Sequence, residues 1–104
     1  MAKRKLAAPQ VSGELVTRCL QYCKLEEIQE NEAELALFKD FMAGAASYLA
    51  KNNIPEDDPQ YRLILFGMTL HDYDHRDDVQ SIQAYPANIR LKIDQLKQTN
   101  FNYG

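Results

Sequence analysis

The chain has 104 residues, a length typical of one domain, and its hydrophobic content of 45% and charged content of 26% favour a folded protein over a disordered one. The formal net charge of −3 argues against a nucleic-acid-binding protein, which normally carries a basic excess. The longest apolar run, "LILFGMTL" at 63–70, is too short to span a membrane. We therefore expect a single domain over residues 1–104, with an ordered core at about 12–97 between a flexible N-terminal arm and a C-terminal tail.

The first helix is predicted over residues 12–23, with Ser12 as its N-cap. Cys19 and Cys23 fall on its apolar face. A rigid helix makes a disulfide between residues four apart awkward, and no signal peptide is recognised, so we expect both cysteines to be reduced core residues. Residues 24–30 then interrupt the helical period. An acidic run without any basic residue inside it follows, formed by Glu26, Glu27, Glu30, Glu32 and Glu34.

The second helix is predicted to begin at Asn31, which forms a capping-box pattern with Glu34, and to end near Asn52. It carries two neighbouring apolar stripes. The first consists of Leu35, Phe38, Met42, Ala45 and Leu49, and the second of Leu37, Phe41 and Tyr48. Such a helix packs either between neighbours of its own domain or between its domain and another subunit.

The third helix is predicted to start at Asp58, as cap, and Pro59, as first helical residue. It is apolar almost all round over 61–70, which indicates the most buried helix. A loop is expected over 77–84, and Pro86 is expected to start an amphipathic fourth helix. No segment shows strand alternation. The predicted fold class is all-α, a small bundle of about four helices.

Both histidines lie in "LHDYDHRDD", and His71, Asp72 and His75 have the spacing of the zinc-protease motif H-E-x-x-H, with aspartate replacing the glutamate base. Asp94 is the only plausible third ligand later in the chain. The histidines occur where the apolar character of the helix stops, which favours a solvent-facing helix end over a catalytic site. We therefore expect no enzyme activity, no metal and no cofactor, and keep a metal-dependent hydrolase as a minor alternative.

The order of these segments resembles the small head–tail connector (adaptor) proteins of tailed bacteriophages. A short helix and acidic loop, "LVTRCLQYCKLEEIQENE", precede a long helix, "LALFKDFMAGAASYLAKN". An apolar helix that ends in histidine, tyrosine and arginine, "LILFGMTLHDYDHRDD", precedes a proline-started helix, "YPANIRLKIDQLK". The resemblance covers about residues 12–97. Its most specific residues are Tyr73, Arg76 and Pro86.

The resemblance implies a structural virion protein that joins the portal vertex to the tail or stopper and forms part of the DNA channel. Its expected partners are copies of itself in a ring, a dodecamer matching the portal, together with the portal protein and a stopper or tail-completion protein. DNA would pass through without sequence-specific binding, and no membrane is involved. The expected location is the head–tail junction of the virion, and the host cytoplasm during assembly.

Several residues follow as interface or docking candidates. Tyr73 is expected to lay its ring on neighbouring helices with its hydroxyl toward water, and Arg76 to cap its helix, pair with Asp72 or reach acids of a neighbouring subunit. The structural or interface candidates are Phe41, Tyr48, Tyr73, Arg76 and Pro86, and the candidate portal-docking tail contains Phe101 and Tyr103. The alternative function is a small helical adaptor or regulatory module that binds another protein through its second helix.

Overall fold

The structure, a computed structural model, describes residues 11–77 and 85–101, with side chains up to residue 98. The described residues form four α-helices and one 3-10 helix and contain no strand, which confirms the predicted all-α class. The elements follow in the order α1 (Gly13–Cys23), η1 (Glu26–Glu30), α2 (Glu32–Lys51), α3 (Tyr61–Asp74) and α4 (Ala87–Phe101). No helix in the described part of the chain is long and apolar enough to cross a membrane.

The first two helices begin where capping chemistry predicts. The Ser12 hydroxyl accepts a hydrogen bond from the Leu15 amide at 3.1 Å, and the Asn31 side chain accepts one from the Glu34 amide, also at 3.1 Å. Helix α1 ends at Lys24, whose left-handed backbone (φ 59°) lets its amide donate to helix carbonyls. The first part of the acidic run then folds as η1, within which Ile28 is the buried residue.

The third helix begins later than predicted. The Asp58 carboxylate accepts a hydrogen bond from the Gln60 amide at 2.9 Å, which closes a turn containing Pro59, and regular helix starts only at Tyr61. The fourth helix begins as predicted, because the Pro86 carbonyl accepts the first helical hydrogen bonds, from the amides of Ile89 and Arg90.

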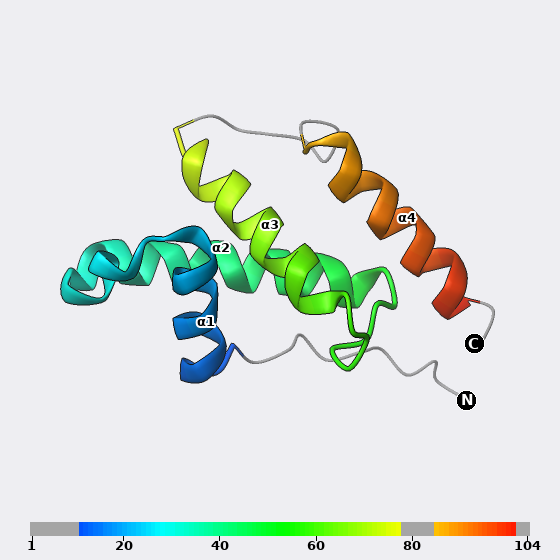
Figure 1. Cartoon of the computed structure of the whole chain (residues 1–104), viewed down its shortest axis with the longest axis horizontal. Coiled ribbons are helices and arrows are strands. Elements are labelled where there is room, and N and C mark those ends of the chain that lie inside the picture. Colours follow the sequence, from blue (N-terminus) through cyan, green and yellow to red (C-terminus); the bar gives the residue numbers. More distant parts are fainter. Residues whose placement is uncertain (1–10, 78–84, 102–104) are drawn as a thin grey trace.

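The long helix α2 is the base on which the other elements pack. Figure 1 shows α3 crossing α2 obliquely, α1 and η1 lying at the end where α2 begins, and α4 lying toward the end where α2 finishes. The core between these elements contains side chains from all four α-helices, among them Leu20, Phe38, Leu49, Leu65 and Ile93. The molecule measures 45 × 28 × 24 Å, so α1 and α4 are separated along its length.

Both apolar stripes of α2 pack within the chain. Phe38, Met42 and Leu49 of the first stripe are fully buried. Leu37, Phe41 and Tyr48 of the second are half-buried and pack against the same core. Within the chain, α2 therefore packs against its own neighbours through both stripes, and the second stripe stays partly accessible.

Candidate functional site

Several of the residues that the sequence singled out lie at the carboxyl end of α3, in two adjacent clusters. The Tyr73 cluster joins α3 to the first half of α2 and consists of Glu34, Phe38, Phe41, Tyr73 and Arg76. The Tyr85 cluster joins α3 to the start of α4 and consists of His71, Asp72, His75 and Tyr85. Together the two clusters fix the position of the carboxyl end of α3 relative to α2 and to the start of α4.

Tyr73 is buried and makes contacts in three directions. Its ring meets Phe38 edge-on at 5.6 Å between ring centroids and Phe41 edge-on at 6.3 Å. Its hydroxyl, which we expected to face water, donates a hydrogen bond to the Glu34 carboxylate instead. Burial, together with this acidic partner, raises the pKa of Tyr73, so the hydroxyl stays protonated as a donor.

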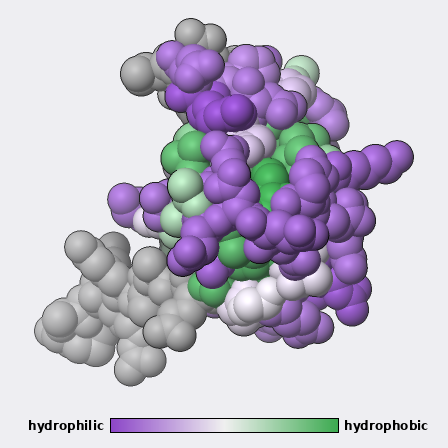
Figure 2. Space-filling model, turned by 90° about the vertical axis from the view of Figure 1, so that its left-hand side faces the viewer, coloured by the Kyte–Doolittle hydropathy of each residue, from purple (hydrophilic) through white to green (hydrophobic). Residues whose placement is uncertain are grey.

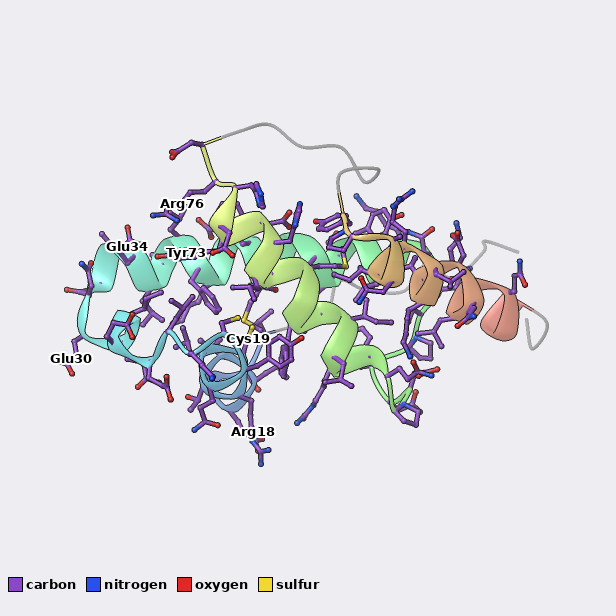
Figure 3. The ribbon with its side chains drawn as sticks, turned by 45° about the horizontal axis from the view of Figure 1, so that its top comes forward. Arg18, Cys19, Glu30, Glu34, Tyr73 and Arg76 are labelled. Carbon is purple, nitrogen blue, oxygen red and sulfur yellow. The ribbon has the colours of Figure 1, made fainter. Side chains whose placement is uncertain are left out.

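Arg76 caps its own helix. Its guanidinium donates a hydrogen bond to the Tyr73 carbonyl at 2.8 Å and lies over the Tyr73 ring, 4.4 Å from the centroid. Figure 3 shows Glu34, Tyr73 and Arg76 side by side where α3 crosses α2. Of the three alternatives considered for Arg76, the structure shows the cap, while the Asp72 carboxylate accepts from Tyr85. A contact of Arg76 with acids of a neighbouring subunit stays a prediction.

The Tyr85 cluster anchors the segment that leads into α4. The Tyr85 hydroxyl donates to the Asp72 carboxylate at 2.7 Å, and its ring lies 4.9 Å from that of His71. Burial raises the pKa of Asp72, although the hydrogen bond from Tyr85 opposes this shift. Burial and the Asp72 carboxylate likewise raise the pKa of Tyr85.

The two histidines are stacked rather than arranged around a metal ion. Their ring centroids are 4.3 Å apart with the planes 28° from parallel, and His75 Nδ1 lies 2.8 Å from the His71 carbonyl oxygen. A tetrahedral zinc site needs in-plane lone pairs that converge on one point, and stacked rings direct them almost in parallel. Within 11–77 and 85–98, no three His, Cys, Asp or Glu side chains gather as metal ligands, Asp94 included.

The two histidines differ in their exposure. We expected both to face solvent, and His75 does. His71 is half-buried, and its Nε2 atom is covered without a hydrogen-bond partner. The ring of His71 is therefore part of the packing between α3 and Tyr85 rather than a free surface group.

The remaining candidates are spread over the molecule. Phe41 belongs to the Tyr73 cluster, Tyr48 lies half-buried two turns further along α2, and Pro86 is exposed at the start of α4. Phe101 is the last residue of α4, with a side chain outside the described set, and Tyr103 lies outside the described residues altogether. The docking role of the tail therefore stays a prediction.

Three further side chains with titratable groups lie in the core or at its edge. Cys19 and Cys23 are free thiols, as predicted. The neighbouring Cys23 and burial raise the pKa of Cys19, and the neighbouring Cys19 lowers the pKa of Cys23. The Tyr61 hydroxyl is buried with no hydrogen-bond partner, and burial raises the pKa of this side chain to about 12. Figure 3 places the Cys19 sulfur between α1 and α3.

Sequence reasoning missed two important partners. The sequence pattern assigns Tyr85 no role of its own, and it assigns Glu34 to the capping box and the acidic run rather than to a contact with Tyr73. The available signal was weak: an aromatic residue next to a helix start, and an acid on the helix face that carries Phe38 and Phe41.

Comparison with protein-family models, with curated proteins and with solved structures gave no match.

Proposed function

We propose that this chain is a non-enzymatic structural subunit of a phage or prophage, which forms the head–tail connector ring between the portal vertex and the tail or stopper. The observation that carries the proposal is the end of α3. Tyr73 and Arg76, the most specific residues of the resemblance, are both engaged in fixing this helix end against α2. A ring subunit needs such rigidity, because an interface closes into a ring only if each subunit presents its surfaces at a fixed angle.

The chemistry of the two clusters also favours assembly over catalysis. Their hydrogen bonds join helices that are distant in sequence, such as the one between Tyr73 and Glu34, 39 residues apart. The imidazoles are occupied by stacking and by a backbone carbonyl rather than directed at a nucleophile. These contacts hold elements together and leave the outer surfaces of α2 and α4 for partners.

The proposed partners follow from this role. Copies of the chain form the ring, a dodecamer if it matches the portal, the portal protein lies on one side, and a stopper or tail-completion protein lies on the other. DNA passes through the channel, and the net charge of −3 lets it slide without being gripped. Tight retention of DNA by the assembled ring at low salt would contradict this last point.

The proposal is tested by co-expressing the chain with the portal protein from the same genome and purifying the portal through a tag. We expect the chain to co-purify in a fixed ratio, and not to co-purify with a portal from an unrelated phage. Absence of the chain from the portal fraction, together with neighbouring genes that encode no portal, capsid or tail protein, would refute the proposal.

A further inference from the structure

A groove lies where the end of α2 faces the last turns of α4. It has a volume of about 330 Å³, and its described lining residues are Lys51, Asn52, Asn53, Lys97 and Gln98. We call it the α2–α4 groove. Its walls are mostly apolar although these side chains are polar, because the methylene stems of long polar side chains form much of such a surface. The groove therefore suits an aromatic occupant that also offers a hydrogen-bonding group.

The charges around the groove do not favour an ion of either sign. Lys51 and Lys97 bring two positive charges to its lining. Exposed acids lie close to both in the chain, because Glu56 and Asp57 follow shortly after α2, and Asp94 precedes Lys97 by about one helical turn. Since both signs are present at this end of the molecule, we expect an occupant without net charge.

The apolar stripe of α4 leads to the groove. Ile93 and Leu96 are buried, and Ile89 packs against the same core at helical spacing. Leu96 directly precedes the lining residues of α4. The stripe next falls on positions 100 and 103, four and seven residues after Leu96, and position 103 is a tyrosine. The helical period of α4 therefore selects Tyr103 over Phe101, whose position is off the stripe.

Tyr103 is also close enough to the groove along the chain. Helix α4 ends at Phe101, and Lys97 and Gln98 lie about 4.5–6 Å before that residue along the helix. Two further residues span up to about 7 Å, and side chains on a helix lean toward its amino end, which extends the reach. Attachment to α4 gives Tyr103 an effective concentration of millimolar order at the groove, ahead of a separate partner.

Other apolar surfaces lie beyond the reach of this residue. A hollow of about 150 Å³ is lined by residues of α1, α3 and α4, among them Leu63, Gly67 and Ile89. Ile89 is about 18 Å from Phe101 along α4. Figure 2 shows hydrophobic surface between hydrophilic side chains at the end of the molecule where α2 begins, and the molecule is 45 Å long. Of these surfaces, only the α2–α4 groove is within reach of Tyr103.

We propose that the α2–α4 groove receives the residues that follow α4, with the Tyr103 ring packed between the stems of Lys51 and Lys97. The ring covers the apolar walls, an ammonium group lies over its face, and the hydroxyl bonds to an amide side chain of the lining. The contact ties the end of α4 to the end of α2 and does not depend on the connector function. Tyr103, one of the two aromatic residues expected to dock on the portal, is then held by its own subunit before assembly.

Solution NMR of the full-length chain tests the contact directly. We expect nuclear Overhauser effects between the ring protons of Tyr103 and the methylene protons of Lys51 and Lys97, because the proposal puts these groups in van der Waals contact. The Tyr103→Phe variant keeps the ring and should keep these effects. Random-coil chemical shifts for residue 103, with no effect to either lysine, would overturn the proposal.

Two alanine variants separate Tyr103 from the other aromatic residue near the end of α4. Tyr103→Ala should shift the amide resonances of Asn52 and Asn53 and lower the melting temperature by roughly 4–8 °C. Phe101→Ala is the matched control, because it also removes one aromatic ring but at a position off the apolar stripe. We expect the control to leave the resonances of Asn52 and Asn53 in place. The same shifts in both variants would contradict the assignment to Tyr103.

A mixed sample distinguishes the chain's own tail from that of a second copy. In an equimolar mixture of isotope-labelled and unlabelled chains, we expect filtered spectra to show the Tyr103 contacts within single chains only. Contacts between labelled and unlabelled chains would assign the groove to the tail of a second copy and refute the proposal. A lower melting temperature of Tyr103→Ala without Overhauser effects to the groove would refute it as well. None of these outcomes bears on the connector function, because no experiment involves the portal.

Discussion

Removing the Tyr73 hydroxyl perturbs one atom of the contact between the start of α2 and the carboxyl end of α3. Tyr73→Phe keeps the ring that packs on Phe38 and Phe41 and deletes only the hydrogen bond to the Glu34 carboxylate. The substitution therefore measures whether this long-range bond stabilises the fold.

The magnitude follows from the burial of the two partners. A hydrogen bond to a charged group contributes about 1.5–3 kcal/mol. Glu34 is half-buried, so water replaces part of the lost bond, and we expect the lower part of that range. A loss of about 1.5 kcal/mol in a domain of this size lowers the melting temperature by roughly 6–12 °C.

The assay is thermal and urea unfolding followed by circular dichroism, with Tyr61→Phe as the matched control. That substitution also removes a buried tyrosine hydroxyl, but one without a hydrogen-bond partner, so we expect no loss of stability and a gain of up to about 1 kcal/mol. A double-mutant cycle with Glu34→Gln isolates the pair. Equal stability of the Tyr73→Phe variant and the wild type, with no coupling to Glu34, would refute the role assigned to this bond.

Three further predictions concern the attachment of α4. Tyr85→Phe removes the donor to the half-buried Asp72 carboxylate, and urea unfolding should show a loss of about 1–2 kcal/mol; no change would mean that the bond does not form in solution. Burial raises the pKa of Asp72 in the folded state above its ordinary value of 3.8, so the folded protein binds more protons just above that pH. Its stability relative to Asp72→Asn should fall as the pH rises through this interval, and parallel stability–pH curves would contradict the assignment. Gly67→Ala gains about 1 kcal/mol of helix propensity but places a new Cβ 3.1 Å from Ile89 Cδ1, so we expect a net change near zero; the full gain would show that Ile89 does not pack there.

Local chemistry predicted the fold better than it predicted the helix contacts. Ser12, Asn31 and Pro86 mark helix starts through hydrogen bonds within four residues, and all three act as predicted. Asp58 also caps a backbone amide, but the bond closes a turn, so the helix begins three residues further on. Sequence alone does not distinguish these two uses of an aspartate before a proline.

The candidate site depended on contacts that cross the fold. The sequence pointed to Tyr73 and Arg76 but not to the partners of Tyr73, because Glu34 is 39 residues away. Tyr85 reaches Asp72 across the 78–84 segment, and no local pattern indicates that it does so. The two apolar stripes of α2 were visible in the sequence, whereas their burial within one chain depended on where α3 crosses.

The most direct test of the connector proposal is electron microscopy of the complex purified after co-expression with the portal protein from the same genome. We predict a closed ring of this chain, coaxial with the portal and continuous with its channel. Portal particles without any added ring, at saturating amounts of the chain, would contradict the proposal.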